Sequence, residues 1–186
     1  EETKQLSFNN YEDKVWIVDP LDGSLNFSRG IPISCISIAL FNGGKHEFGC
    51  IYDFNRKELF VAEENNCILN KNKITTSNIK EKSKGILCTG FPSWRNYENE
   101  SLNIFLHQIK DWKKVRAIGS AALSLAWVAR GWVDAYMEED IRIWDVAAGL
   151  TLVKAAGGGI FIKENNRTNF VTAIATNGHI SVRELV

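Results

Sequence analysis

The spacing of hydrophobic residues changes along the chain, from alternation in the first half to helical spacing in the second. Residues 31–40 alternate apolar with small polar side chains, a pattern typical of a half-buried β-strand. Residues 42–44 (Asn-Gly-Gly) have the composition of a hairpin turn, and apolar runs follow at 47–52 and 58–62. We therefore expect three antiparallel strands in succession, closed by a polar loop over 63–73.

The second half of the chain predicts helices and strands in alternation. A helix over 119–131 is rich in Ala and Leu and ends at Gly131, a residue type favoured just after helix ends. Another helix is predicted to begin at 144–145 and to end at the three glycines 157–159. The other elements expected here are a helix at 98–111 and strands at 86–90, 115–118, 132–137, 160–162 and 171–175. This order predicts an α/β layered fold with a mixed sheet, formed by a single domain over 1–186.

Composition narrows the class of protein. The chain has 186 residues, of which 45% are hydrophobic, enough for one globular domain with a buried core. Its 22 basic and 22 acidic residues cancel and form no long run of one sign, which argues against a nucleic-acid partner and favours a small molecule. Since no apolar run approaches the roughly twenty residues needed to cross a bilayer, we expect no membrane association.

Four cysteines are widely spaced along the chain: Cys35, Cys50, Cys67 and Cys88. Because three of them lie in apolar runs, we expect core thiols rather than zinc ligands or disulfides. Free thiols suit a reducing compartment, so a cytoplasmic protein is expected. The opening residues Glu1-Glu2-Thr3 lack a Met and any preceding strand, so we expect the chain to begin at a cut end.

A turn with two carboxylates follows the first apolar run. The run over 15–18 predicts a buried strand, and the residues after it are Asp19-Pro20-Leu21-Asp22-Gly23. Proline disfavours helix at Asp19, while Gly23 allows a sharp bend. The two carboxylates and the Leu21 carbonyl can therefore converge, and converging oxygens are what a hard divalent cation requires.

The N–H groups of Gly23 and Ser24 are placed to open a helix and to bind an anion. A cation site beside an anion site indicates phosphate chemistry. The alternative is an ordinary strand-to-loop turn, because Asp, Pro and Gly dominate turns for local reasons alone. Asp145 leaves a similar choice open, since an acidic residue in the first turn of a helix is stabilised by the helix dipole.

Longer motifs favour a site for phosphate chemistry over an ordinary turn. Residues 19–27 (Asp-Pro-Leu-Asp-Gly-Ser-Leu-Asn-Phe) closely resemble the motif Asp-Pro-(Ile/Leu)-Asp-Gly-(Thr/Ser)-x-Asn-Phe of the inositol monophosphatase family. That family comprises magnesium-dependent phosphomonoesterases. Residues 144–149 (Trp-Asp-Val-Ala-Ala-Gly), followed by 156–158 (Ala-Gly-Gly), are similar to its second motif, although Ala155 stands where the family has Glu.

Two further segments add to this resemblance. Residues 116–122 and 131–136 are similar to the family's block Arg-x-x-Gly-(Ser/Thr)-Ala-Ala and Gly-x-x-Asp-Ala-Tyr. Glu1-Glu2 resembles the family's Gly-Glu-Glu motif without the glycine, at about the family's distance before Asp19.

The resemblance implies a layered α-β-α-β-α sandwich of the inositol monophosphatase/fructose-bisphosphatase type, one domain over 1–186 that lacks the family's N-terminal helices. It also implies two or three Mg²⁺ ions and a homodimer. The metal ligands carried over are Glu1, Asp19, Asp22, Asp145 and the carbonyl of Leu21. The catalytic residues carried over are Glu1, Asp22 and Ser24, where the family usually has Thr for Ser24. The substrate-binding residues carried over are Gly23, Ser24, Gly119, Ser120, Ala121 and Glu138.

The activity implied is hydrolysis of inositol monophosphate or a sugar phosphate by a metal-activated water. Two alternatives stay open. One is a 3′(2′),5′-bisphosphate nucleotidase of the same family, although residues 25–27 resemble inositol-type members more closely. The other is a non-catalytic regulator that binds a cation or a phosphate, against which the retention of Asp19, Asp22 and Asp145 argues.

Overall fold

The computed structural model describes residues 14–91 and 97–185, which contain two β-sheets. The first sheet is antiparallel and follows chain order, with strands β1 (Lys14–Asp22), β2 (Cys35–Asn42), β3 (Lys45–Asp53), β4 (Glu58–Glu63), β5 (Asn66–Leu69) and β6 (Asn72–Lys73). The second has the order β10 (Gly159–Glu164), β11 (Phe170–Thr176), β9 (Ala135–Arg142), β7 (Ile86–Thr89) and β8 (Lys114–Arg116). Because β7 runs parallel to both neighbours and the other pairs are antiparallel, the predicted mixed sheet is confirmed.

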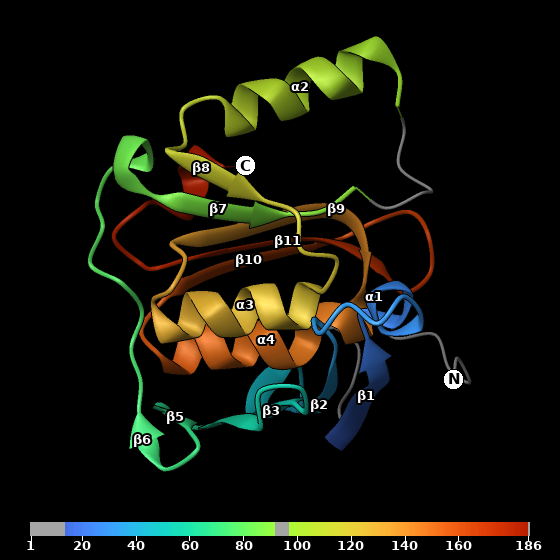
Figure 1. Cartoon of the computed structure of the whole chain (residues 1–186), viewed down its shortest axis with the longest axis vertical. Coiled ribbons are helices and arrows are strands. Elements are labelled where there is room, and N and C mark those ends of the chain that lie inside the picture. The colour runs from blue at the N-terminus through green and yellow to red at the C-terminus, as the bar shows by residue number, and fades with distance from the viewer. Residues whose placement is uncertain (1–13, 92–96, 186) are drawn as a thin grey trace.

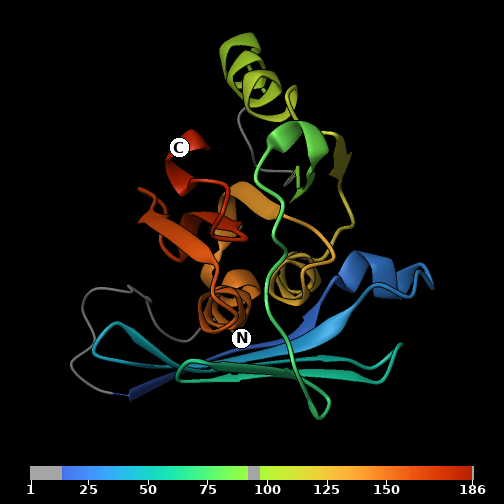
Figure 2. The ribbon, with the colours of Figure 1, turned by 90° about the vertical axis from the view of Figure 1, so that its left-hand side faces the viewer.

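The helices form layers with the sheets. They are α1 (Ser24–Ser28), α2 (Asn99–Ile109), α3 (Ala121–Arg130) and α4 (Ile143–Ala155), with 3₁₀ turns η1 (Lys82–Lys84) and η2 (Val182–Glu184). Figures 1 and 2 show α3 and α4 between the two sheets and α2 beyond the second sheet. The described residues therefore form β-α-β-α layers, as expected for the layered α/β fold. None of their helices combines the length and the apolar character needed to cross a membrane.

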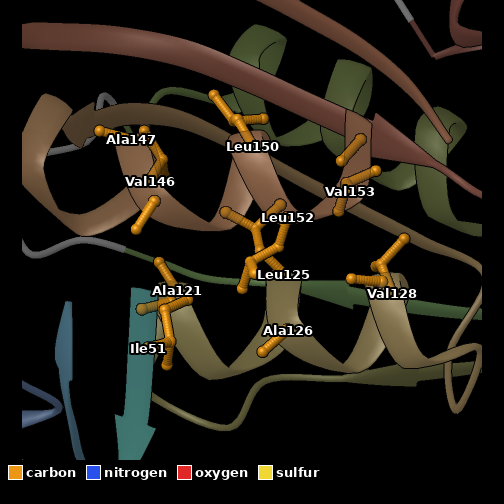
Figure 3. Close-up of a cluster of buried hydrophobic side chains, with 14 of the residues drawn as sticks. Ile51, Ala121, Leu125, Ala126, Val128, Val146, Ala147, Leu150, Leu152 and Val153 are labelled. Carbon is orange, nitrogen blue, oxygen red and sulfur yellow. The ribbon is translucent and has the colours of Figure 1, made fainter. Parts of the chain in front are cut away.

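The core lies around the two central helices (Figure 3). Helix α4 is buried on nearly every side, because it packs between two sheets and against α3. Gly149 permits the contact with α3, since a Cβ atom there would lie 2.4 Å from Cβ of Leu125. Close packing of α4 fixes the position of its first turn, which carries Asp145.

The outer face of the first sheet is apolar and partly exposed. Trp16 and Val18 on β1 are 59% and 48% exposed, and Tyr52 and Leu59 on β3 and β4 are each 37% exposed. Within the part of the chain that the structure describes, no helix covers this face (Figure 2).

Several sequence expectations need correction. The buried strand expected over 15–18, with a turn at 19–23, instead continues through Asp22 as β1 and exposes Trp16 and Val18. The segment 63–73 was expected to be a loop, but it contains β5 and β6 at the sheet edge. The strand expected from residue 31 begins at Cys35, because Asn26 Nδ2 donates to the Ile33 carbonyl at 3.0 Å and holds the preceding segment away from the ladder. The expected core position of the cysteines is confirmed, since three are buried and Cys50 is half-buried.

Candidate metal and phosphate site

Three aspartates meet where β1 ends and α4 begins. Asp19 and Asp22 are 8% and 7% exposed, and Asp145 lies in the first turn of α4. One carboxylate oxygen from each of the three residues lies within 4.8 Å of the others. The convergence of Asp19 and Asp22 agrees with the sequence prediction, and Asp145, carried over as a metal ligand from the family resemblance, lies beside them.

A β-bulge brings Asp19 and Asp22 to the same side of the sheet. Asp19 pairs with Ser37 and Asp22 with Cys35, so three steps along β1 match two steps along β2. Regular alternation would turn positions 19 and 22 to opposite faces, and the extra residue removes that difference. The bulge contains Pro20, which lacks a ladder donor.

The N-terminus of α3 holds Asp22 in place. Oδ2 of Asp22 accepts hydrogen bonds from the Ser120 hydroxyl and from the Ala122 N–H, the latter at 2.9 Å. The Ser120 hydroxyl in turn accepts from the Leu123 N–H at 3.2 Å and caps the helix. Burial raises the pKa of Asp22 to about 6, and the charge of Asp19 adds to this rise, while the hydrogen bonds oppose it.

Negative charge is concentrated in this cluster. Oδ1 of Asp19 accepts from the Leu21 N–H at 3.0 Å, which fixes that carboxylate within the turn. Burial raises the pKa of Asp145, and the nearby charges of Asp22 and Asp19 raise it further. A divalent cation among these oxygens would remove the repulsion, and an all-oxygen ligand set suits Mg²⁺ better than zinc. The residues present therefore fit the metal site that the motifs imply.

A pocket of about 380 Å³ opens over the three carboxylates. Its described lining is Val18, Asp19, Pro20, Leu21, Asp22, Gly23, Ser24, Arg142, Trp144 and Asp145. Gly23 adopts a left-handed conformation with φ of 76°, and a Cβ atom there would lie 2.6 Å from the Ile33 carbonyl oxygen. Glycine is therefore required at the point where β1 passes into α1.

The other predicted substrate residues lie around the pocket rather than in its lining. Gly119 adopts φ of 72° and packs against the side chain of Asn26. Ser120 and Ala121 begin α3 and are buried. Glu138 is 8% exposed and accepts a hydrogen bond from the Tyr136 hydroxyl at 3.0 Å.

Glu1, predicted as a metal ligand and catalytic residue, lies outside the described residues. Sequence reasoning missed Arg142 and Trp144, which line the pocket. It also missed the contact of Ser120 with Asp22. The Trp144-Asp145 motif pointed to this region, but nothing in the sequence pairs residue 120 with residue 22.

The layered fold and the cluster of Asp19, Asp22 and Asp145 agree with the family that the sequence motifs indicate. The chain belongs to the inositol monophosphatase family, whose model matches residues 1–181.

Sequence matches to individual curated proteins support the family assignment. The Nus factor SuhB of Xylella fastidiosa is 43% identical over 146 residues, which cover 77% of this chain and 53% of that protein. The chain thus spans about half the length of the curated relatives it matches.

Among solved structures, extragenic suppressor protein suhB from Bartonella henselae has a TM-score of 0.79 and 36% identity, covering 90% of this chain and 66% of that one. Inositol monophosphatase from Anabaena (Nostoc) sp. PCC 7120 has a TM-score of 0.78 and 36% identity, covering 92% and 69%. SaIMPase-II with bound inositol monophosphate has a TM-score of 0.83 at 26% identity, covering 100% and 72%, and the same protein has been solved with 2′AMP.

Proposed function

We propose that this chain carries the active site of a Mg²⁺-dependent phosphomonoesterase acting on a small polyol or sugar phosphate. The observation that supports this most strongly is the set of three buried or half-buried aspartates with oxygens within 4.8 Å of one another, on the floor of a pocket. Buried carboxylates at this spacing repel each other, and they persist in a fold only where something else compensates the charge.

The proposed ligands are Asp19, Asp22, Asp145 and the Leu21 carbonyl, joined by Glu1 from the segment outside the described residues. When bound, Mg²⁺ lowers the pKa of a water and polarises the phosphoryl group. The metal ligand Asp22 is oriented by the Ser120 hydroxyl and the Ala122 N–H, so that ordering its carboxylate costs little when a cation binds.

The phosphate itself is assigned to the start of α1. Gly23 and Ser24 line the pocket beside the carboxylates, where their N–H groups are the proposed donors to phosphate oxygens. The exposed Ser24 hydroxyl and the Glu1 carboxylate are proposed to orient and deprotonate the attacking water.

The proposed substrate is a polyol phosphate, and its support is separate from that for the metal site. A polyol phosphate is supported by the likeness to SaIMPase-II with bound inositol monophosphate. A nucleotide monoester is the alternative within the family, because the same neighbour was also solved with 2′AMP. Absence of nucleic-acid binding and formation of a homodimer stay predictions, the first from balanced charge and the second from the family resemblance.

A second candidate function is a regulator that binds a cation or a phosphate without turnover. It is favoured by the name Nus factor, which several curated relatives of this chain carry. The aspartate cluster serves both candidates, because a cation-binding regulator uses the same carboxylates, and phosphate release distinguishes the two.

Phosphate release from inositol 1-phosphate, 2′AMP and an aryl phosphate, each with Mg²⁺ and with EDTA, tests these proposals together. The phosphomonoesterase predicts Mg²⁺-dependent release, fastest with the polyol ester. Preference for 2′AMP would favour the nucleotidase. Binding of Mg²⁺ by calorimetry without release from any ester would favour the regulator.

A further inference from the structure

Helix α1 contributes to the pocket lining but has little packing of its own. It spans Ser24–Ser28, begins directly after Gly23, and none of its five residues is buried. The backbone hydrogen bonds of its residues stay within 23–31. A segment with so few buried contacts is easily displaced. Gly23 and Ser24 line the pocket, so their place there depends on side-chain contacts that join α1 to the rest of the fold.

The side chain of Asn26 makes this connection. Its Nδ2 donates to the carbonyl of Ile118 at 2.8 Å and to the carbonyl of Ile33 at 3.0 Å, with a longer contact to that of Gly119 at 3.3 Å. These carbonyls belong to two segments, one before β2 and one before α3. Figures 1 and 2 show α1 beside the start of α3. Because all three carbonyl oxygens are acceptors, they fix the orientation of the Asn26 amide.

The segment before α3 leads directly into Ser120, the residue whose hydroxyl donates to Asp22. Ser120 is held in place independently of Asn26. Its hydroxyl accepts from the Leu123 N–H at 3.2 Å, and its carbonyl accepts from the Ser124 hydroxyl at 2.7 Å. The start of α3 is therefore fixed by its own hydrogen bonds, and Asn26 fixes α1 against it.

We propose that Asn26 is a positioning residue, which holds Gly23 and Ser24 at a fixed place relative to the aspartate cluster. This rests on the proposed function, which assigns phosphate to Gly23 and Ser24 and the metal to the aspartates. Asn26 is not among the described residues that line the pocket, so it acts through the backbone of 23–26. Because Asp22 is held by Ser120, Asn26 governs the affinity for phosphate and not that for Mg²⁺.

The effect of losing the amide follows from these contacts. Two carbonyls would lose a donor, and α1 has no buried side chain to hold it in place. Phe27 contacts the ring of Phe54 edge-on, with centroids 6.1 Å apart, but remains 55% exposed. Ser24 would then shift relative to the aspartates, and a small misplacement of a binding group weakens binding. A carboxylate at position 26 would repel the same carbonyls.

The test measures phosphate affinity and Mg²⁺ affinity separately in the folded full chain. Asn26→Ala should raise the Kd for inorganic phosphate in the presence of Mg²⁺, and KM for inositol 1-phosphate, by about ten-fold. The Kd for Mg²⁺ alone should change by less than about two-fold, because Ser120 still holds Asp22. Asn26→Asp should weaken phosphate binding at least as much, and Asn26→Gln, which keeps the amide on a longer side chain, should fall between.

Asn55→Ala is the matched control. Nδ2 of Asn55 donates to the carbonyl of Ser34 at 3.2 Å, next to the carbonyl that Asn26 contacts, but Asn55 belongs to the turn between β3 and β4 and not to α1. Its truncation removes an amide donor from the same segment before β2. It should leave the phosphate and Mg²⁺ affinities unchanged.

Calorimetry with inorganic phosphate needs no turnover, so it separates failure of this role from failure of the proposed function. If the unaltered protein binds phosphate but hydrolyses no ester, the proposed function fails, and a weaker phosphate complex of Asn26→Ala would still support the role of Asn26. Equal phosphate affinities for Asn26→Ala and Asn55→Ala would overturn it. Parallel losses of phosphate and Mg²⁺ affinity would also overturn it, because they would assign Asn26 to the fold in general. Absence of phosphate binding by the unaltered protein would overturn both proposals.

Discussion

The Ser120 hydroxyl donates a hydrogen bond to Oδ2 of Asp22 and so joins the start of α3 to the end of β1. The same oxygen accepts the Ala122 N–H, so both donors from α3 converge on it. One oxygen of the carboxylate is thereby held by the fold. Ser120, predicted from family resemblance as a substrate contact, also positions a proposed metal ligand.

Ser120→Ala should therefore lower both stability and Mg²⁺ affinity. It removes the helix cap and one donor to a buried carboxylate, which together are worth about 1–3 kcal/mol of unfolding free energy. Denaturant unfolding and Mg²⁺ calorimetry measure the two effects.

Ser124→Ala is the matched control, because the buried Ser124 hydroxyl donates to the Ser120 carbonyl at 2.7 Å and not to Asp22. Ser120→Thr keeps a hydroxyl and should retain most of the Mg²⁺ affinity. Equal Mg²⁺ affinities for Ser120→Ala and Ser124→Ala would show that the contact does not support the metal site.

The stabilisation by Mg²⁺ should grow with pH. The pKa of Asp22 rises from 3.8 to about 6 on folding, so the folded state binds the extra proton between these values. Without metal, this group's contribution to stability falls as pH rises through that window and stays low above it. Mg²⁺ removes the repulsion once the protons have left, so it should raise Tm more at pH 7.5 than at pH 4.5. If Mg²⁺ raised Tm equally at pH 4.5 and pH 7.5, the proposed binding of Mg²⁺ by the aspartate cluster would be contradicted.

His46 should give stability an opposite dependence on pH. Burial lowers the pKa of His46 from 6.5 to about 4, and its Nδ1 lies 2.8 Å from the hydroxyl oxygen of Thr151 on α4. The neutral form is favoured in the fold, so this stability is fully present above pH 6.5 and is lost as pH falls toward 4. Through His46, the free energy of unfolding changes by at most about 1.4 kcal/mol per pH unit.

His46→Gln should flatten the loss of stability between pH 6.5 and 4, measured in EDTA by denaturant unfolding. His107→Gln, which changes an exposed histidine on α2, is the control. Identical pH profiles for the unaltered protein and His46→Gln would refute this assignment.

The sequence predicted the features that depend on neighbouring residues and missed those that depend on contacts between distant parts of the chain. The segment 19–23 carried part of its own information, since Pro20 and Gly23 indicate an irregular backbone locally. Asp19 and Asp22 converge as expected, although residues 19–22 belong to the bulged end of β1 and not to a turn. Asp145 could be added only through the family resemblance, because the contact forms when α4 packs between two sheets. The bulge that brings the first two carboxylates together depends on pairing with β2, which no local pattern specifies.

The errors have a similar cause. Segment 63–73 was assigned to a loop because Asn and Lys dominate it, yet polar and charged residues are also how edge strands avoid pairing with other molecules. Cys67 in β5 is fully buried while its neighbour Asn66 is exposed, the alternation of a strand at the sheet edge. Arg142 has no local signal as a pocket residue, since its position beside Phe170 forms only when β9 pairs with β11.

The prediction for Glu138 concerns the substrate's hydroxyls. Its carboxylate already accepts from Tyr136, and we expect a polyol to use the remaining acceptor capacity when bound. Glu138→Gln should lower the ratio of kcat/KM for inositol 1-phosphate to that for an aryl phosphate by roughly ten-fold, the effect of one weakened charged hydrogen bond. Equal loss on both esters would place Glu138 in the support of the metal site or the fold.

The most direct test is Mg²⁺-dependent phosphate release by the unaltered protein and by Asp22→Asn in parallel, with Glu63→Gln as an exposed control on the same sheet. The isosteric change removes one repelling charge, so metal-free Tm at pH 7.5 should rise, while phosphate release at saturating Mg²⁺ should fall by orders of magnitude. Glu63→Gln should change neither quantity. Phosphate release by Asp22→Asn at the rate of the unaltered protein would contradict the metal-dependent phosphatase that the three aspartates support.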